Sequence, residues 1–537
     1  MPGLAKASGG GQILGLSVAG CPAADVVWPG MNVATRKEDR HVRLRELCAE
    51  VLEARRLIVV SNRGPVEYRL APDGQVQARR STGSLVTAFS SLMREIPYTW
   101  IASAMGEGDR RVWEGNQGGA IPAGLPGAKF SLRYVNTPRR VYHRYYNTFC
   151  NPLLWFLQHN MWSSSYSPIV DSAVHDAWEN GYAQVNRSFA EAVVAEANGG
   201  SGPVCVMLHD YHLYLVAGHV RKELPKAIIN HFIHIPWPAS GYWELLPAYI
   251  RRSICESLCS ADIVGFQTRR DGHNFLQTCE EFLPAAQVDY ASRSVTLDGR
   301  QTLVKAYPLS INVEEVRHIA TSPRALDYER QLRALPGEKT IVRVDRAEPN
   351  KNILRGFRAY EILLQRHPEL RGQVKFLAFL VPARTHIRQY QRYLEEVQEM
   401  VKGINVTYGT PEWQPIHLFM ENNYIQAIAG MRLYDVLLEN AVSDGMNLVA
   451  KEGPVVNGSD GVVVLSEATG AYPQLAHGAL AVSPADVEGT MQAMYDALAM
   501  TAEERRRRRE VLVEAIQRED TTHWFQRQFE DLKALGM

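Results

Sequence analysis

Short apolar segments that end in polar residues recur along the chain, and this repetition constrains the fold more than any other feature. Each segment has the length of a buried strand, and stretches with helical periodicity, such as residues 173–197, lie between them. Alternation of strands and helices predicts an α/β fold with parallel sheets. The segments in the first half are LIVVSN (57–62), PVCVMLHD (203–210), AIINHFIHIPWP (227–238), ADIVGFQT (261–268) and TLVKAYPLSI (302–311).

The pattern breaks near residues 320–338 and then starts again, which predicts two α/β units. A chain of 537 residues is also too long for a single core. We expect a first domain over residues 46–320, a second over 338–505, and a C-terminal helix over 506–537 that packs back on the first. The strands expected in the second domain are TIVRVD (340–345), VKFLAFLV (374–381), QPIHLFM (414–420), YDVLLEN (434–440) and GVVVLS (461–466).

The first 45 residues are rich in Gly, Ala and Pro and lack periodicity, which predicts a disordered extension. ILGLSVAGC (13–21) resembles a lipoprotein cleavage site, but its apolar core is short and Lys6 is the one basic residue ahead of it. A disordered extension, or a true start at Met31, is therefore favoured over an export signal. No apolar run reaches the ~20 residues of a membrane span, so we expect no membrane association.

The charge balance argues against a nucleic-acid partner. Lys+Arg and Asp+Glu both number 58, and the one dense basic run, ERRRRRE (504–510), has the pattern of a solvated helix face. The seven cysteines include no CxxC pair, which predicts reduced thiols in a cytoplasmic protein and no metal site. Whether copies of the chain form a homo-oligomer is left open.

Polar residues stand where the predicted strands end. In open parallel sheets, ligands bind beyond the carboxyl ends of the strands, so these side chains predict a site in the cleft between the two domains. Packing alone does not require polar groups at so many strand ends. The residues concerned are Asn62, Arg63, His209, Asp210, His234, Asp345, Arg346, Arg384 and Asp444.

Two segments of the second domain have the chemistry of an anion site. In VDRAEPNKN (344–352), Arg346 and Lys351 follow a strand and precede a helix, which suits a diphosphate, although a surface loop with routine ion pairs has the same pattern. In SDGMNLVAKE (443–452), Asp444 either caps a helix or contributes to a helix start that binds an anion, with Glu452 two turns later.

The first domain offers candidates for a sugar or a second phosphate. His234 precedes a Pro-Trp-Pro turn that holds its loop rigid, and Gly83 precedes a helix start that could bind phosphate through backbone N–H groups. Asn147, Asn151 and Trp155 are four residues apart and would share one face of a helix. Core packing is the alternative for the aromatic residues of this segment.

The ordered set SNRGP, YYNTFCNPLLW, HDYHL, FIHIPWP, VGFQT, VDR…K and DGMNLVAKE resembles the trehalose-6-phosphate synthase family over residues 56–535. This resemblance implies the GT-B fold, with two Rossmann-like domains facing each other across a cleft. It also implies a retaining glycosyltransferase that moves glucose from a nucleoside-diphosphate glucose to glucose-6-phosphate. The small-molecule substrates would be UDP-glucose or GDP-glucose and glucose-6-phosphate, with no cofactor and no metal.

The resemblance also implies residue roles. It assigns the chemistry to Asp210, His234, Arg346, Lys351 and Asp444. It assigns the acceptor to Arg63, Tyr146, Trp155, Asp210 and Arg384. It assigns the donor to Gly83, Ser84, His234, Arg346, Lys351, Asp444, Gly445, Met446, Asn447, Leu448, Val449 and Glu452.

This chain departs from the family pattern around the predicted nucleotide. Ser84 replaces the second glycine of the first loop, Asn352 follows the lysine in place of glycine, and Ser443 stands where arginine is frequent. The base of the donor therefore stays open among uracil, guanine and adenine, with UDP-glucose as the default and GDP-glucose as its main competitor. Two other functions also fit parts of the pattern: a transferase of the same fold with glycerol phosphate or a cyclitol phosphate as acceptor, and a sugar-phosphate sensor without activity. The retained acceptor residues and the retained Arg346, Lys351 and Glu452 argue against them.

Overall fold

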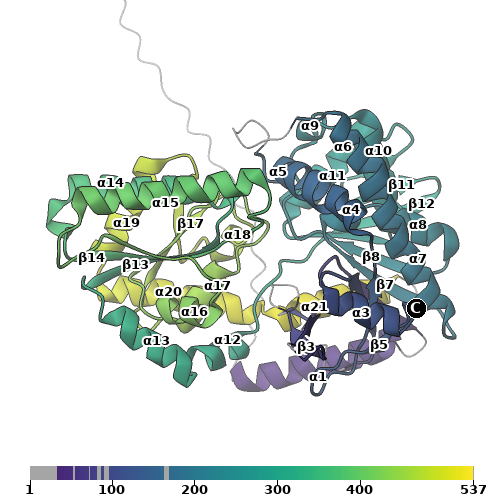
Figure 1. Ribbon diagram of the computed structural model, residues 1–537, viewed down its shortest axis with the longest axis horizontal. Helices are drawn as coiled ribbons and strands as arrows, with labels where there is room; N and C mark the ends of the chain where they lie inside the picture. The colour runs from purple at the N-terminus through teal and green to yellow at the C-terminus, as the bar shows by residue number, and fades with distance from the viewer. Residues whose placement is uncertain are drawn as a thin grey trace, which may run out of the picture.

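The computed structural model describes residues 33–52, 55–71, 73–81, 86, 88–89, 96–161 and 169–535. These residues form two α/β units, each built around its own large sheet (Figure 1). Within the described residues, none of the helices combines the length and the apolar character that a membrane span needs.

The first unit is built on a ten-stranded sheet with the order β10-β11-β12-β9-β8-β7-β1-β4-β6-β5. The seven strands from β12 to β6 are parallel, and the remaining pairs at the two edges are antiparallel. A separate hairpin joins β2 (Val66–Leu70) and β3 (Val76–Arg80). The strands of the sheet are β1 (Arg56–Val60), β4 (Thr99–Ser103), β5 (Ile121–Pro122), β6 (Ser131–Val135), β7 (Val204–His209), β8 (Ile228–Phe232), β9 (Ile263–Phe266), β10 (Gln287–Asp289), β11 (Ser294–Leu297) and β12 (Arg300–Ala306).

The second unit is built on a six-stranded sheet that is parallel throughout, with the order β15-β14-β13-β16-β17-β18. Helices cover both of its faces, which explains why its strands are apolar on both sides. The strands are β13 (Lys339–Arg346), β14 (Val374–Val381), β15 (Ile416–Phe419), β16 (Val436–Glu439), β17 (Val462–Ser466) and β18 (Leu480–Val482).

Both sheets reverse their strand order at one point. In the second sheet the chain starts at β13, moves outward to β15 and resumes beside β13 with β16; in the first sheet β1 and β7 flank the same kind of reversal. The helices that follow the strands on the two sides of such a point cover opposite faces, so a crevice opens beyond the strand ends. The topology thus predicts one crevice in each unit, at the ends of β1 and β7 and of β13 and β16.

The helices form two layers in each unit. In the first unit one layer packs against the alternate strand residues Ile58 and Val60, and the other layer packs against Leu57 and Val59. The helices are α3 (Glu107–Gly115), α4 (Arg139–Tyr142), the π-helix η2 (His143–Leu154), α5 (Trp155–Gln158), α6 (Ser172–Ala177), η3 (Trp178–Ala183), α7 (Gln184–Asn198), η4 (Tyr211–Leu213), α8 (Val216–Glu223), α9 (Ser240–Trp243), α10 (Ala248–Leu258) and α11 (Arg269–Phe282).

The boundary expected near residue 320 needs correction, because the helices there belong to the core of the second unit. Val313, Val316 and Ala320 of α12 and Leu332 of α13 are buried together with strand residues of the second sheet. The helices of this unit are α12 (Val313–Ala320), α13 (Pro323–Arg333), η5 (Pro349–Lys351), α14 (Ile353–Arg366), η6 (Pro368–Leu370), α15 (Arg388–Tyr408), α16 (Tyr424–Met431), α17 (Val449–Val456), α18 (Tyr472–Leu475), α19 (Val487–Ala499) and α20 (Ala502–Arg518).

The two ends of the described chain pack together on the first unit, which corrects the expectation for both. Helix α1 (Val33–Leu52) starts well before residue 45, and its Leu44, Leu47 and Val51 are buried in the same cluster as Trp524 of α21 (Thr521–Ala534). The sequence could not show this, because the apolar partner of α1 lies near the other terminus. The return also begins later than residue 506, since α20 stays on the second unit and α21 alone crosses back.

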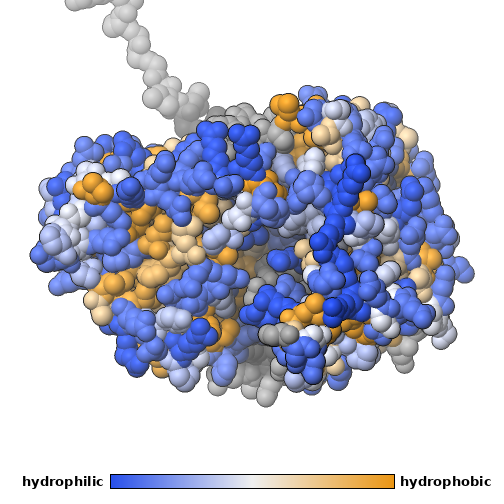
Figure 2. All heavy atoms as spheres, in the orientation of Figure 1, coloured by the Kyte–Doolittle hydropathy of each residue, from blue (hydrophilic) through white to orange (hydrophobic). Residues whose placement is uncertain are grey.

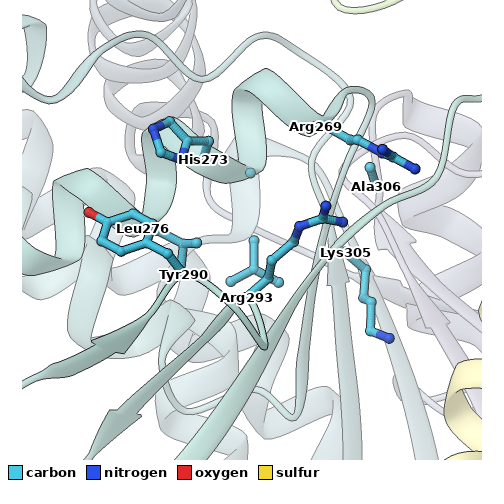
Figure 3. A pocket seen from close by; sticks show the side chains of 9 residues that line it. Arg269, His273, Leu276, Tyr290, Arg293, Lys305 and Ala306 are labelled. Atoms are coloured by element: carbon cyan, nitrogen blue, oxygen red, sulfur yellow. The ribbon is translucent and has the colours of Figure 1, made fainter. Parts of the chain in front are cut away.

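Ion pairs and hydrogen bonds fix α21 on the first unit. Lys305 Nζ lies 2.8 Å from one carboxylate oxygen of Asp531, and the Tyr307 hydroxyl donates to the other over 2.7 Å. Figure 3 shows Lys305 pointing away from Arg269 and Arg293, with which it lines a small pocket of about 50 Å³. The last helix is therefore a structural part of the first unit.

Candidate functional site

A buried ion-pair cluster follows the reversal point of the second sheet. Lys351 Nζ lies 2.6 Å from Asp444 Oδ2 and 3.4 Å from Asp345 Oδ1. Asp345 also pairs with Arg343 over 2.7 Å. Burial would raise the pKa of Asp444, but the nearby Lys351 outweighs it and lowers that pKa, while the two carboxylates raise the pKa of Lys351. At neutral pH Asp444 and Lys351 are both charged, and Lys351 is a fixed cation at the crevice.

The segment SDGMNLVAKE forms a loop followed by α17, and its geometry distinguishes the two hypotheses for Asp444. The N-cap residue of α17 is Leu448, and Asn447 before it, with a positive φ of 74°, accepts from the N–H of Ala450 through its Oδ1 over 3.0 Å. Its amide also donates to Glu439 Oε2 over 2.8 Å. Asp444 is therefore not the cap, which corrects that hypothesis, and its carboxylate is committed to Lys351.

Gly445 lies at the contact between the two units. A Cβ atom on this residue would stand 2.0 Å from the carbonyl oxygen of His234, so only glycine permits this close approach. The predicted donor loop of the second unit and the histidine loop of the first unit thus touch along their backbones. This contact joins the two crevices into one site.

The first unit contributes a histidine and a carboxylate held in low dielectric. His209 Nδ1 and His234 Nε2 are 3.2 Å apart, and the backbone N–H of His234 donates to Asp210 Oδ1 over 3.3 Å. Burial lowers the pKa of His234 to about 3 and raises the pKa of Asp210 to about 6. At neutral pH the imidazole is neutral and the carboxylate is mostly ionised, so this pair can bind hydroxyl groups without a positive charge.

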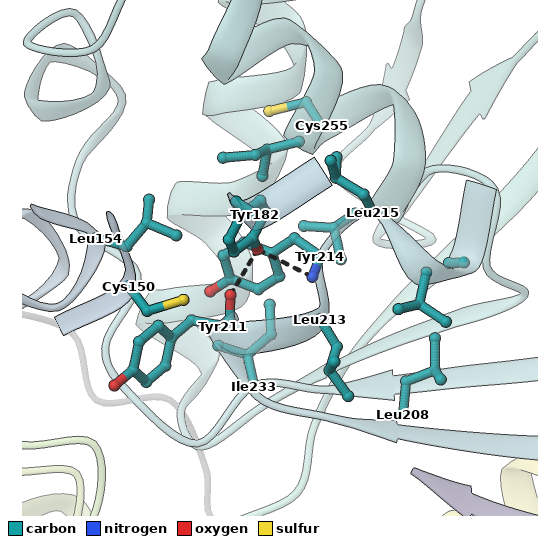
Figure 4. Close-up of a cluster of buried hydrophobic side chains, with 14 of the residues drawn as sticks. Cys150, Leu154, Tyr182, Leu208, Tyr211, Leu213, Tyr214, Leu215, Ile233 and Cys255 are labelled. Atoms are coloured by element: carbon teal, nitrogen blue, oxygen red, sulfur yellow. Dashed lines mark hydrogen bonds between the residues drawn. The ribbon is translucent and has the colours of Figure 1, made fainter. Parts of the chain in front are cut away.

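A tyrosine behind the site fixes the loop that carries Asp210. Tyr182, buried in the first core, donates its hydroxyl hydrogen to the carbonyl of Tyr211 over 2.7 Å and accepts from the N–H of Tyr214 over 3.2 Å (Figure 4). Asp210 itself has a φ of 75°, an uncommon value for a residue other than glycine. The loop is therefore held in a strained conformation by bonds from the core.

Arg384 meets three of the groups around the cleft. Its Nη1 lies 2.6 Å from Glu348 Oε1 and 3.0 Å from the hydroxyl of Tyr390. Its guanidinium carbon lies 5.5 Å from the centre of the Trp155 ring, within the range of a cation–π contact. Glu348 also lies 3.3 Å from Arg346. One buried carboxylate thus joins a predicted acceptor residue to a predicted diphosphate residue.

Arg63 and Tyr146 lie at the strand end of the first unit. Arg63 follows β1 with a side chain that is 64% exposed, and its guanidinium lies 3.7 Å from the carboxylate of Glu67, so it is paired but accessible to a ligand. Tyr146 stacks on the imidazole of His212, with the ring centres 5.8 Å apart. Asn151 does not share a ligand-facing surface with Asn147 and Trp155: it is fully buried and accepts from the Tyr211 hydroxyl over 2.7 Å. The expectation of one common ligand-facing side is wrong, because Trp155 is buried as well, whereas Asn147 bonds near the surface to His386 over 2.9 Å.

Glu452 lies near the start of α17 and is held by a residue that the sequence reasoning missed. The hydroxyl of Tyr424 donates to Glu452 Oε1 over 2.8 Å. Burial raises the pKa of Glu452 to about 7, and the bond from Tyr424 opposes that rise. Leu448, just before the helix, packs against the cores of both units, and Val449 packs against the second core. Met446 is also buried, and Gly83 and Ser84 lie outside the described residues.

Three residues contact the predicted site residues in ways that the sequence does not predict. The sequence places Asp345 at a strand end but does not show its pair with Lys351, and it assigns no role to Glu348 or Tyr424. The alternation of cations and acids in RVDRAE (343–348) was the available signal for the first two. No sequence signal pointed to Tyr424, because it reaches Glu452 from a different helix.

Over the described residues, no three His, Cys, Asp or Glu side chains are grouped so that they could hold a metal ion. Six described cysteines are buried free thiols: Cys48, Cys150, Cys205, Cys255, Cys259 and Cys279.

Comparison with known proteins identifies what the chain is similar to. Residues 55–534 match the family described as glycosyltransferase family 20. The chain is 30% identical over 478 residues to alpha,alpha-trehalose-phosphate synthase [UDP-forming] A of Dictyostelium discoideum, with 87% of this chain and 61% of that protein covered. It is 30% identical over 485 residues to a synthase of the same name, numbered 2, of Aspergillus fumigatus, with 87% and 95% covered. The chain spans less than two thirds of the first of these relatives.

Solved structures agree in fold. The crystal structure of an alpha,alpha-trehalose-phosphate synthase (UDP-forming) from Burkholderia xenovorans in complex with glucose-6-phosphate has a TM-score of 0.76 and 27% identity, with 89% of this chain and 100% of that chain covered. A trehalose-6-phosphate structure from E. coli bound with UDP-2-fluoro glucose has the same TM-score and identity, with 89% and 99% covered. The predicted fold class and the predicted family are confirmed.

Proposed function

The chain belongs to glycosyltransferase family 20, and on this premise we propose that it transfers glucose from a nucleoside-diphosphate glucose to glucose-6-phosphate. The products would be trehalose-6-phosphate and the nucleoside diphosphate. Relatives named as UDP-forming synthases, and a similar structure solved with glucose-6-phosphate, support this choice of substrates. UDP-glucose is the expected donor.

The observation that carries the proposal is the convergence of two crevices at Gly445. Lys351 and Arg346 stand on the second unit, where the diphosphate would lie, and Asp210 and His234 face them from the first. In the reaction, the bond between the anomeric carbon and the diphosphate oxygen breaks, and negative charge grows on the leaving phosphate. Lys351 and Arg346 would stabilise that charge, and one such contact is worth about 3 kcal/mol in other enzymes.

The acceptor would bind between the two units, where Arg63 follows β1 and Arg384 follows β14. Arg384 and Arg63 would hold the 6-phosphate, and the Trp155 ring orients Arg384 from behind. The anomeric hydroxyl of glucose-6-phosphate then attacks the donor carbon from the face that the diphosphate leaves. Its proton passes to the departing phosphate oxygen. Because attack and departure take place on the same face, the configuration of the donor sugar is retained. The neutral imidazole of His234 would form a hydrogen bond with a hydroxyl group of the donor glucose, and without a positive charge it would not attract the phosphate.

Incubation of the purified chain with glucose-6-phosphate and each of UDP-, GDP- and ADP-glucose tests the proposal. We expect a phosphorylated disaccharide with at least one donor, identified by mass and by NMR of its two α-anomeric carbons. Glycerol phosphate and a cyclitol phosphate serve as alternative acceptors in parallel reactions. Absence of any product with glucose-6-phosphate would refute the proposal, and a product with another acceptor alone would reassign the substrate.

No resident cofactor or metal is needed, because Lys351 and Arg346 supply positive charge at the diphosphate. A cytoplasmic location fits the buried free thiols, which persist in a reducing compartment. A nucleic acid or membrane partner is not part of the proposed activity, and gel filtration would decide between a monomer and a homo-oligomer.

A further inference from the structure

A groove on the outer edge of the second sheet lies apart from the site described above. It has a volume of about 360 Å³, within the range of small-molecule pockets. The face of the second unit shown in Figure 2 exposes hydrophobic residues between α15 and α13. The groove runs along β15, two strands away from β13 and its crevice. Its lining comes from α13, β15 and α16: Gln331, Leu332, Leu335, Gln414, His417, Leu418, Phe419 and Gln426.

Two polar atoms of this lining are buried without a partner. Gln426 is 9% exposed, and its Oε1 has no hydrogen-bond partner among the described residues. His417 Nε2 is likewise buried without a partner in the described part of the chain. An unpaired buried polar atom costs free energy, because it has lost water and gained nothing in return. A bound molecule with hydroxyl groups in the groove would supply both missing bonds.

The groove favours an uncharged molecule. None of the lining residues is an acid, a lysine or an arginine. The ammonium group of Lys375, which lowers the pKa of His417, donates to the carbonyl of Leu335 over 2.6 Å and is engaged there. Burial, and then Lys375, lower the pKa of His417, so its imidazole is neutral at pH 7. A phosphate or carboxylate would lose its hydration here without gaining a counter-charge.

The edge of β15 argues against an added peptide strand. The N–H and C=O of Ile416 point away from the sheet, and both bond to the side chain of Asn405 over 2.9 Å. Since backbone direction repeats every second residue, Leu418 is the remaining strand residue with outward-facing groups. One residue is too short a platform for strand addition, but it offers a small molecule one donor and one acceptor.

We propose that this groove is a second ligand site, which binds an uncharged sugar. A sugar hydroxyl both donates and accepts, so one ring can satisfy Gln426 Oε1, His417 Nε2 and the backbone of Leu418. Its apolar C–H face would lie on Phe419 and Leu335, as sugars do on mixed amide and hydrophobic walls. The groove shares no residue with the predicted donor and acceptor sites, so a sugar can bind it without taking part in the transfer reaction.

Calorimetry and saturation-transfer NMR on the full chain test the proposal, with trehalose and glucose as the probes. We expect millimolar binding of at least one of them. Gln426→Leu should weaken this binding about tenfold, the loss expected for one hydrogen bond to a buried group. His417→Phe should do the same, and it provides a second variant in case Gln426→Leu does not fold. Gln492→Leu, which changes an exposed amide of the same unit, is the matched control and should bind as the wild type does.

The outcomes are separable from those of the transferase assay. Loss of binding in both groove variants with normal binding in the control supports the proposal, even if no transferase activity is found. No binding of either probe, or equal binding in the folded groove variants and the wild type, overturns it. Equal binding in the variants would place the sugar in the cleft, and a competing excess of glucose-6-phosphate would then displace it.

Discussion

Replacement of Lys351 by methionine should destabilise the protein as well as abolish its proposed activity. Methionine keeps the length of the side chain but leaves Asp444 and Asp345 without their cation. With an effective dielectric constant of about 20, attractions at 2.6 and 3.4 Å amount to roughly 6 and 5 kcal/mol before desolvation. Burying the ammonium opposes this, and removal of one partner from a buried pair costs about 3–5 kcal/mol net.

The assay is urea unfolding of the wild type and Lys351→Met, each monitored by circular dichroism and tryptophan fluorescence. We expect urea unfolding to show a loss of about 3–5 kcal/mol, and thermal unfolding of the same variant to show a Tm lower by roughly 10 °C for a unit of this size. The matched control is Lys533→Met, because Lys533 pairs with Glu50 over the same 2.6 Å but half exposed. The control should lose less than about 1 kcal/mol.

A double-mutant cycle identifies the cause. Asp444→Asn in the Lys351→Met background removes the carboxylate that was left unpaired, while Asp345 keeps its bond to Arg343. We expect the double variant to recover about 2 kcal/mol relative to Lys351→Met. A loss below about 1 kcal/mol in Lys351→Met, or additive losses in the cycle, would refute the electrostatic explanation. Both variants should lose activity, so stability and not turnover is the deciding measurement.

Other predictions test the acceptor side, the ribose side and the contact between units. Arg384→Ala should raise the KM for glucose-6-phosphate about 10- to 100-fold, since it removes a charged bond to phosphate, and unchanged acceptor KM would exclude that role. Tyr424→Phe should raise the donor KM about fivefold at pH 7. Because loss of the bond from Tyr424 raises the pKa of Glu452 further, the midpoint of the dependence of donor KM on pH should also move to higher pH. For Lys451, burial lowers the pKa to about 7, so the unfolded state binds more protons than the folded state between pH 7 and 10.5. The free energy of unfolding should therefore rise by about 3 kcal/mol between pH 7 and 9.5. Lys451→Met should flatten this rise when urea unfolding is measured at each pH.

The strand positions and the polar residues at strand ends were predictable from sequence, because a strand covered on both faces must be apolar throughout. Lys351, Asp444, Asp210 and His234 stood out for this reason: each follows such a strand on a loop. The order of motifs also identified the family. The partner of each charged group was not predictable, since Glu348 and Arg384 are 36 residues apart and meet only when β13 and β14 align.

The sequence by itself determined two sheets built mainly of parallel strands, a donor loop on one and a histidine loop on the other. Periodicity and loop chemistry are local, so they can be read without the fold. Only the tertiary structure decided that Lys351 pairs with Asp444, that α1 meets α21, and that Gly445 touches His234. These are contacts between distant segments, fixed by the order of strands in each sheet and by the packing of one unit against the other.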